Sequence, residues 1–370
     1  MKVIILGGCA DMAIPLIELL KDDSDINKVT LADINGEKAW KLASIHGEKF
    51  EGVFCDANNH DGVVSLIKEN DVVICYVGPF YIFEKKLAQC AIDAGVDYVS
   101  ISDDYDAYLD VITLEEEAKN KNVKILTGFG NSPGITQILA RKGYNDLKNT
   151  YKISINWCAG SDESVGVSNL IHLFHIFNGN TLQWFDGKEV KVKTGLGKKV
   201  VEFPEPIGKN KVYYTGHAES VSLPRNLPGL KEVTLHGGVK PEYIVDLIKF
   251  MSNLGLFNTH KKRVGLAKFF HKIERWFSSK GINKSVGRID VYGKDNEKEL
   301  YKYFTYVGHI ASITSIPAYL AAKWLLKGIF QNKPGGVYSA ERILEEPTKF
   351  IEELKSLGVE IFESETISKS

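Results

Sequence analysis

The chain has 370 residues, of which 44% are hydrophobic and 25% charged, so its composition is that of a folded globular protein. This length exceeds one ordinary hydrophobic core and favours two domains. Lys and Arg number 46 against 47 Asp and Glu, a balance that excludes a general electrostatic attraction to nucleic acid.

Cysteine usage and apolar runs indicate a cytoplasmic protein that does not cross or enter a membrane. The five cysteines are odd in number and contain no CxxC pair, which favours reduced structural thiols over a disulfide framework or a zinc site. The N-terminal apolar run is too short for a signal peptide. The run from 310 to 330 contains Pro317, Lys323 and Lys327, so we expect a buried helix there.

The first third of the chain alternates short β-branched runs with helix-like stretches. Expected strands cover residues 3–6, 29–32, 53–55, 72–76, 98–101 and 123–126. Expected helices cover residues 12–21, 37–46, 61–69, 83–94 and 114–121. Apolar strands separated by helices are typical of a parallel sheet covered on both faces, so this part predicts a Rossmann-type doubly wound α/β domain.

The pattern changes after residue 132. Several later runs alternate polar and apolar residues and predict antiparallel strands at 151–158, 188–192, 212–215, 231–235, 285–292 and 299–307. We therefore expect a Rossmann domain over 1–132 and an α+β substrate and dimerisation domain, with a mostly antiparallel sheet, over 133–314. Residues 315–370 would return to the Rossmann domain as helices at 315–327 and 347–357.

Residues 261–288 form an unusually basic segment, with nine Lys or Arg residues and one acid, Glu274. Apolar residues at helical spacing lie between these charges: Leu266, Phe269, Phe270, Ile273, Trp276 and Phe277. The pattern favours an amphipathic helix docked on the core or on a second subunit. A role at a membrane surface or with an anionic ligand is the alternative interpretation.

A glycine turn follows the first expected strand and predicts a dinucleotide site. In a GxGxxG register, Gly8 takes the tight turn, Ala10 the position closest to the pyrophosphate, and Ala13 the helix–strand packing position. The helix that follows would direct the backbone N–H groups of Asp11 and Met12 at the pyrophosphate. Alanine at two glycine positions weakens the motif, and a plain strand–helix turn is the alternative.

Asp33 ends the second expected strand, where an acid can accept hydrogen bonds from the adenosine ribose. Its charge would repel the 2′-phosphate of NADP, and no Arg follows, so we expect NAD, with NADP less suitable. Asp56 would lie near the adenine or cap a helix. Val77, Gly78 and Pro79 follow the fourth strand, beside the crevice where open α/β sheets bind ligands.

The chain resembles the saccharopine dehydrogenase family, which includes saccharopine reductases, carboxynorspermidine dehydrogenases and lysine 6-dehydrogenases. The stretches that carry the resemblance are residues 7–13, 71–80, 90–99, 128–136 and 328–362. It implies a Rossmann domain joined to an α+β substrate domain, dimer formation, and hydride transfer between the nicotinamide and a carbon–nitrogen bond. By the same resemblance, Val77, Gly78, Pro79, Ser132, Pro133 and Gly134 would line the cofactor. The role of Asp103, where this sequence departs from the family pattern, stays open.

The reacting groups are expected in the stretch 214–225. His217 suits proton exchange near neutral pH, and Glu219 would share its face if the stretch is a strand. Arg225 could hold a substrate carboxylate, which points to an amino acid or imine substrate. A structural role for each is the alternative. His172 and His175 lack a third ligand at a known spacing, so we expect no metal.

Two other functions fit the same residues. One is an NAD-dependent reductase that acts on a carbonyl instead of an imine. The other is a non-catalytic NAD-binding module that senses redox state or acts as a scaffold.

Overall fold

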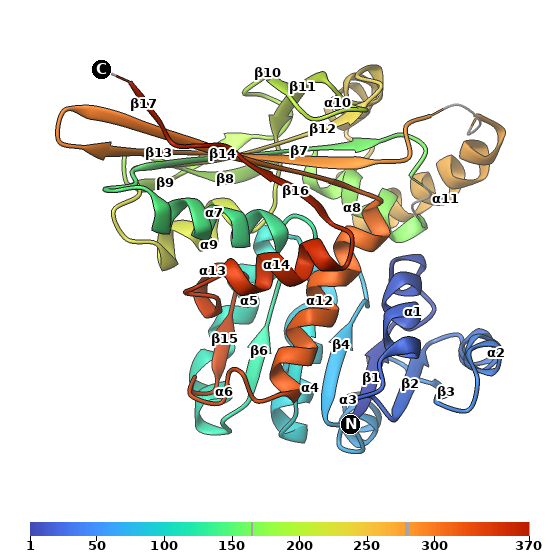
Figure 1. Cartoon of the computed structure of the whole chain (residues 1–370). Helices are drawn as coiled ribbons and strands as arrows, with labels where there is room; N and C mark the ends of the chain where they lie inside the picture. Colours follow the sequence, from blue (N-terminus) through green and yellow to red (C-terminus); the bar gives the residue numbers. More distant parts are fainter. Residues whose placement is uncertain (164–165, 278–280, 370) are drawn as a thin grey trace. The chain divides into compact units, whose positions relative to one another are not determined.

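The computed structural model describes residues 1–163, 166–277 and 281–369, and the chain divides into two units (Figure 1). Unit 1 comprises Met1–Ile135 and Ala311–Ile343, and unit 2 comprises Thr136–Ile310 and Leu344–Ser370. These bounds differ from the expected ones at the C-terminus. Residues 344–370 group with unit 2, because their strands pair with the sheet of that unit.

Unit 1 is built on a parallel sheet whose described strands lie in the order β15-β6-β5-β4-β1-β2-β3. The strands are β1 (Lys2–Leu6), β2 (Lys28–Asp33), β3 (Phe50–Phe54), β4 (Val72–Cys75), β5 (Asp97–Ser100), β6 (Lys124–Leu126) and β15 (Gly336–Tyr338). The strands β1 to β6 lie in the order of a Rossmann fold, which confirms the predicted fold class. The sequence did not reveal β15, which extends the sheet beside β6.

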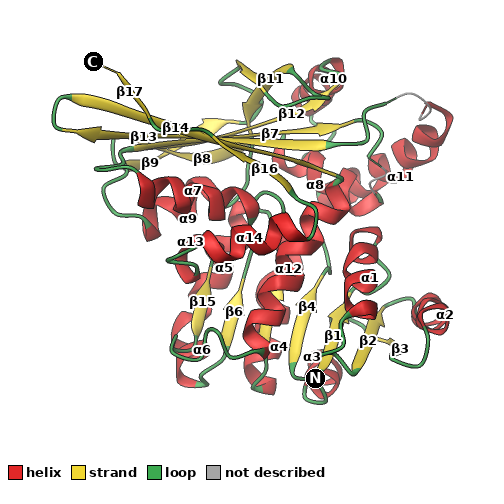
Figure 2. Cartoon of the chain, in the orientation of Figure 1, coloured by secondary structure: helices red, strands yellow, loops and turns green. Residues whose placement is uncertain are grey.

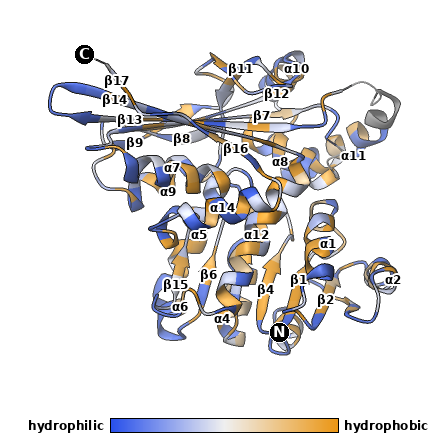
Figure 3. Ribbon diagram, viewed as in Figure 1, coloured by the Kyte–Doolittle hydropathy of each residue, from blue (hydrophilic) through white to orange (hydrophobic). Residues whose placement is uncertain are grey.

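Helices connect the strands of unit 1 (Figure 2). They are η1 (Asp11–Ala13), α1 (Ile14–Asp22), α2 (Gly36–His46), α3 (His60–Ile67), α4 (Phe80–Ala94), α5 (Tyr105–Val111), η2 (Ile112–Leu114), α6 (Glu115–Asn120), α12 (Ile310–Leu326) and α13 (Ala340–Ile343). The strands β1 and β4 are strongly hydrophobic (Figure 3), and all their side chains except that of Lys2 are buried. A sheet that is apolar on both faces needs helices on both, which is why β-strands and helices alternate here.

Unit 2 contains a mixed, mostly antiparallel sheet, as predicted, with described strands in the order β10-β11-β12-β7-β13-β14-β16. These are β10 (Lys199–Glu202), β11 (Lys209–Tyr214), β12 (Glu232–Lys240), β7 (Lys152–Gly160), β13 (Ser285–Asp295), β14 (Lys298–Gly308) and β16 (Glu360–Glu363). Off this path, β17 (Ile367–Lys369) pairs with β14, and β8 (Asn180–Phe185) pairs with β12 and with β9 (Lys188–Lys193). The helices are α7 (Ile135–Asp146), α8 (Val167–Ile176), α9 (Glu219–Asn226), α10 (Tyr243–Asn253), α11 (His260–Phe277) and α14 (Thr348–Ser356).

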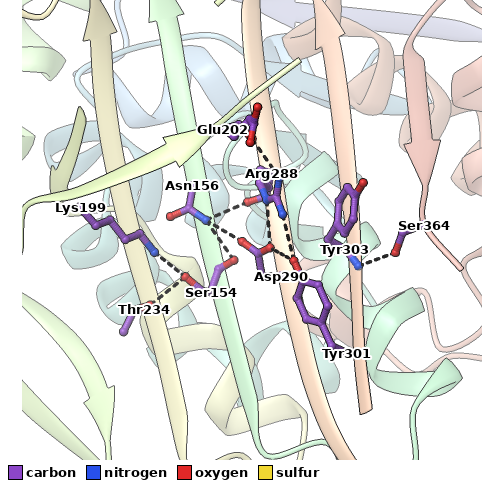
Figure 4. Close-up of polar contacts among 10 residues, drawn as sticks. All are labelled: Ser154, Asn156, Lys199, Glu202, Thr234, Arg288, Asp290, Tyr301, Tyr303 and Ser364. Atoms are coloured by element: carbon purple, nitrogen blue, oxygen red, sulfur yellow. Dashed lines mark hydrogen bonds and ion pairs between the residues drawn. The ribbon is translucent and has the colours of Figure 1, made fainter. Parts of the chain in front are cut away.

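A polar network crosses one face of this second sheet (Figure 4). Asp290 accepts hydrogen bonds from Arg288 Nε at 2.9 Å and from the Tyr301 hydroxyl at 2.6 Å, so Arg288 of the same strand balances its charge and Tyr301 links it to β14. Lys199 reaches over the sheet and donates to Ser154 Oγ at 2.8 Å, and burial lowers the pKa of its amine to about 8. Polar groups on a sheet face are tolerated when they satisfy one another in this way.

The basic segment 261–288 forms the expected amphipathic helix, docked on the core, only in its first part. Its first part is α11, which packs on α8 through the Phe270 and Phe174 rings, 6.0 Å apart. Its last part belongs to β13, where Arg288 joins the network described above. The expected contacts of Ile273, Trp276 and Phe277 lie outside the residues whose side chains are described. Within the described ranges, no helix is long and apolar enough to cross a membrane.

Candidate nucleotide and proton-transfer sites

The glycine turn after β1 is built on Gly7 rather than Gly8. Gly7 has a φ of +77°, and a Cβ there would lie 2.9 Å from the carbonyl carbon of Tyr76. Gly8 instead packs over β2, where a Cβ would lie 3.0 Å from Leu31 Cα. The predicted register is therefore wrong by one residue at its first glycine, because the positive φ that only glycine adopts easily falls at Gly7.

Ala10 precedes η1, and the helix continues as α1. The N–H groups of Asp11 and Met12 open this helix, where backbone geometry provides no intrahelical acceptor. Asp11 is exposed and Met12 half-buried, so both N–H groups are placed at the surface of the carboxyl edge of the sheet. A helix start of this kind is suited to a phosphate group.

Asp33 joins the end of β2 to the glycine turn. Its Oδ2 accepts from the backbone N–H of Cys9 at 3.0 Å, and its Oδ1 accepts from the N–H of Asn35 at 2.9 Å. Each carboxylate oxygen has a further lone pair, so the ribose hydroxyls of a dinucleotide could still donate to it. The arrangement fits an adenosine-binding strand end, as the sequence predicts.

Lys38 adds a cation that sequence reasoning missed. It lies in the first turn of α2, and its Nζ donates to the carbonyl oxygen of Cys9 at 2.8 Å. The ammonium group is therefore held on the same turn as the Asp33 carboxylate. The sequence could have indicated Lys38 only through the predicted fold, because the second helix of a Rossmann unit begins beside the glycine turn.

The cysteine in this turn is not a nucleophile. Burial and the neighbouring Asp33 carboxylate raise the pKa of the Cys9 thiol to about 11. Burial likewise raises the pKa of Cys158 to about 12. Both are neutral thiols at physiological pH, in agreement with their expected structural role.

Asp56 shapes the loop after β3. Its Oδ1 accepts from the backbone N–H of Asn58 at 2.9 Å, and Asn59 caps α3 by accepting from Gly62 N at 3.1 Å. The predicted capping role thus belongs to Asn59, whose side chain lies at the N-terminus of the helix.

Two further expected cofactor loops follow parallel strands of unit 1. Val77, Gly78 and Pro79 connect β4 to α4, and no atom lies within 4 Å of a Cβ added at Gly78, so this loop is open. After β6, Gly134 has a φ of +122°, and a Cβ there would lie 2.0 Å from Gly130 O. Ser132 and Pro133 complete this tight turn, which Gly130 N closes by donating to Pro133 O at 3.1 Å.

His217 lies in unit 2, in the connection between β11 and α9. Glu219 is the first residue of α9, so the strand that would have put both side chains on one face is not present here. Pro224 inside α9 obscured the helix in the sequence. The Glu219 carboxylate is fully buried and accepts from Thr136 Oγ1 at 2.7 Å.

The His217 ring is held on both sides. It stacks on the Trp157 indole with ring centroids 5.3 Å apart and planes 8° from parallel, and its Nε2 lies 3.1 Å from Nε2 of His172. Two imidazole nitrogens at this distance share one proton, because one must donate while the other accepts. The sequence identified His172 only as a candidate metal ligand, since its proximity to His217 depends on the packing of α8.

Arg225 is engaged away from the histidine pair. Its guanidinium NH2 contacts Glu189 Oε1 of β9 at 2.6 Å, and NH1 donates to the carbonyl oxygen of Val221. Helix α9 carries Arg225 in its last turn, where a cation also interacts favourably with the helix dipole.

Comparisons with known proteins agree with this geometry. A family model described as the saccharopine dehydrogenase NADP binding domain matches residues 3–126. A search of curated protein sequences gives no match.

Solved structures match nearly the whole chain. Saccharopine dehydrogenase (L-Glu forming) from Saccharomyces cerevisiae matches with a TM-score of 0.72 at 17% identity, covering 99% of each chain. Homospermidine synthase from Legionella pneumophila, in complex with NAD, matches with a TM-score of 0.62 at 14% identity, covering 98% of this chain and 91% of that one. Amine dehydrogenase from Mycobacterium smegmatis matches with a TM-score of 0.52 at 10% identity, covering 92% and 95%.

These structural matches show that the chain shares the fold of these solved structures. The family model establishes that unit 1 is a pyridine-nucleotide-binding domain. Residues 3–126 are thus similar to the nucleotide-binding domain of the saccharopine dehydrogenase family.

Proposed function

We propose that this protein is an oxidoreductase that transfers hydride between NAD and a carbon–nitrogen bond of an amino acid or imine. The observation that carries the proposal is the His172–His217 pair, placed in unit 2 of a chain whose unit 1 is a nucleotide-binding domain. When bound, NAD supplies or accepts the hydride. The protein must then position the nucleotide and manage a proton at the substrate nitrogen.

The residues of unit 1 have separate tasks in nucleotide binding. The turn at Gly7 and Gly8, with the N–H groups of Asp11 and Met12, would hold the pyrophosphate. Asp33 would accept hydrogen bonds from the adenosine ribose, and its charge favours NAD over NADP. The loops that begin at Val77 and Ser132 follow neighbouring parallel strands and would line the rest of the dinucleotide, with Asp56 near the adenine.

The two histidines would exchange a proton with the substrate nitrogen. Stacking on Trp157 fixes the plane of the His217 ring, so its Nε2 stays directed at His172. If His217 takes a proton from an amine at Nδ1, it can release the proton on its Nε2 to Nε2 of His172, so its imidazole returns to the neutral form. Arg225, already paired with Glu189, has the weakest support among the residues proposed to contact substrate.

We also propose that the protein works as a cytoplasmic homodimer on a small-molecule substrate. The described cysteines are all free thiols, as expected for a reducing compartment. The dimer rests on the family resemblance, and light scattering of the purified chain would test it.

The decisive experiment is incubation of the purified chain with NAD and a panel of amino acids that includes lysine and saccharopine. We expect absorbance at the NADH wavelength with at least one amine. NADH oxidation by simple carbonyl compounds, without reaction of any amine or imine, would instead identify a carbonyl reductase. Calorimetric NAD binding without turnover on any amine or carbonyl would identify a non-catalytic NAD-binding module.

A further inference from the structure

Helix α10 of unit 2 carries an apolar face that no described part of the chain covers. Tyr243, Leu247, Phe250 and Leu254 are 68%, 46%, 62% and 61% exposed. Their spacing of four, three and four residues places them on one side of the helix. Together these four residues form what we call the α10 surface.

The opposite side of α10 is also apolar, since Val245, Ile248 and Met251 are buried against unit 2. A helix with two apolar faces normally packs against something at each of them. The α10 surface is therefore contiguous and is suited to a partner outside the chain.

Two lysines lie at one end of the α10 surface. Lys193 Nζ donates to Asn253 Oδ1 at 3.1 Å, and Lys262 Nζ donates to Gly255 O at 3.1 Å, so both are anchored at the C-terminal end of α10. Lys249 lies over the Tyr213 ring, 4.1 Å from its centroid. Cations are thus held at the C-terminal end of the apolar strip.

Helix α11 extends the positive charge. From residue 243 to 272 there are six Lys or Arg residues and a single acid, Asp246. Glu242, just before this stretch, is paired with Lys211 at 2.7 Å. On α11, Lys261, Lys268 and Lys272 are exposed together with Phe269, which is 56% exposed.

We propose that the α10 surface docks on an anionic lipid bilayer, with its apolar side chains in the headgroup region and the lysines against the acidic lipids. An exposed apolar helix face bordered by cations is the chemistry that binds such a surface. The charge argues against a second copy as the occupant. A two-fold interface would place the lysines of one protomer near those of its partner without acids to balance them.

The test is co-sedimentation of the full chain with vesicles of phosphatidylcholine alone or mixed with about one-third phosphatidylserine. We expect binding to the mixed vesicles only, weakened by added salt. The apolar variant Leu247→Ser/Phe250→Ser and the charge variant Lys261→Glu/Lys268→Glu should each raise the half-saturating lipid concentration at least roughly tenfold. Trp40→Ser, which removes a 62% exposed apolar side chain from α2 of unit 1, should bind like the parent chain.

Three results would overturn the proposal. The first is no sedimentation of the parent chain with mixed vesicles, and the second is unchanged binding by either double variant. The third is a light-scattering mass above one chain that falls in Leu247→Ser/Phe250→Ser, which would make the α10 surface a subunit interface. All substituted side chains are exposed, so unchanged circular dichroism and thermal unfolding should accompany each variant.

Discussion

His172 and His217 come from different elements, yet their Nε2 atoms lie 3.1 Å apart. If the pair moves a proton at the substrate nitrogen, His217→Asn and His172→Asn should each lower kcat on the order of 100-fold. NAD binding, which depends on unit 1, should change little. Steady-state kinetics and NAD calorimetry would check this, with the exposed His309→Asn as the matched control. If neither histidine variant lowers kcat, the pair has no part in the mechanism.

Asp33 and Lys38 bring opposite charges to the glycine turn. Asp33→Asn keeps a hydrogen-bond acceptor and removes the charge that would repel a 2′-phosphate. We expect NADP affinity to rise about tenfold, with a smaller change for NAD. In the Asp33→Asn chain, the further change Lys38→Ala should reverse the gain in NADP affinity, because the cation beside the turn is then lost.

Calorimetric titration with 2′-AMP and 5′-AMP would measure this directly, without turnover. Lys41→Ala on the same helix is the control, because Lys41 pairs with Glu37 rather than with the turn. Equal affinity of the parent chain for NAD and NADP would contradict the role given to Asp33.

At the residue scale, strand-end positions were more predictable than contacts between distant segments. Asp33 could be assigned because a strand end determines where its carboxylate lies. The role of His172 depended on how α8 packs, and no local pattern contains that information. Gly7 was missed for a different reason, since two adjacent glycines allow two registers and only the backbone φ decides between them.

Among the connecting elements, the turn from β6 to α7 has the tightest constraint. Gly134→Ala would place a methyl group 2.0 Å from Gly130 O at a φ of +122°. We expect a loss of unfolding free energy of about 3 kcal/mol or more. Gly95→Ala at the end of α4 is the control, because no atom lies within 4 Å of its Cβ and only the left-handed backbone costs about 1 kcal/mol. Urea denaturation of both variants would separate the effects, and equal losses would contradict the steric argument.

Helix α12 contacts the rest of unit 1 through the buried carboxylate of Asp23. Asp23 Oδ2 accepts from Lys323 Nζ and from the Tyr319 hydroxyl, both at 2.7 Å. Burial opposes the charge of Asp23, but these hydrogen bonds outweigh it and hold its pKa below the usual value. A lowered folded-state pKa means that the stabilisation is present above the unfolded pKa of about 4 and is lost as the pH falls through the folded value.

Asp23→Asn should therefore cost about 2 kcal/mol of unfolding free energy at neutral pH, since it leaves Lys323 only its longer contact with Asp25, at 3.6 Å. The difference from the parent chain should shrink as the pH falls below about 4. Asp22→Asn, at an exposed neighbouring position, should change little. Urea denaturation across this pH range would check the sign, and a deficit that grows in acid would refute it.

Elements with a long, uniform pattern were predictable, and edge elements were not. The apolar runs of β1 and β4 and the alternation in β13 and β14 indicated their strands because burial imposes those patterns. The short strands β10, β15 and β16 lie at sheet edges, and only their neighbours determine that they pair.

On the scale of the whole molecule, neither unit is one continuous stretch of chain. Unit 1 needs residues 311–343 for α12 and β15, and unit 2 needs residues 344–370 for β16 and β17. A chain ending at residue 310 should therefore fail to give soluble folded protein. Removal of residues 366–370 takes away only β17 and should be tolerated. Soluble expression and circular dichroism would compare the two, and a folded 1–310 fragment would contradict the assigned units.

The late position of β15 has a consequence for biosynthesis. Strand β6 ends at Leu126, but its neighbour β15 ends at Tyr338. At roughly 5–20 residues per second, the ribosome needs about 10–40 s to make the intervening chain. During that interval the backbone groups of β6 face no strand on one side, which is the condition under which nascent chains pair with one another. The cell must therefore shield this edge while translation continues, so production of the protein should depend on cotranslational chaperones more than its final fold suggests.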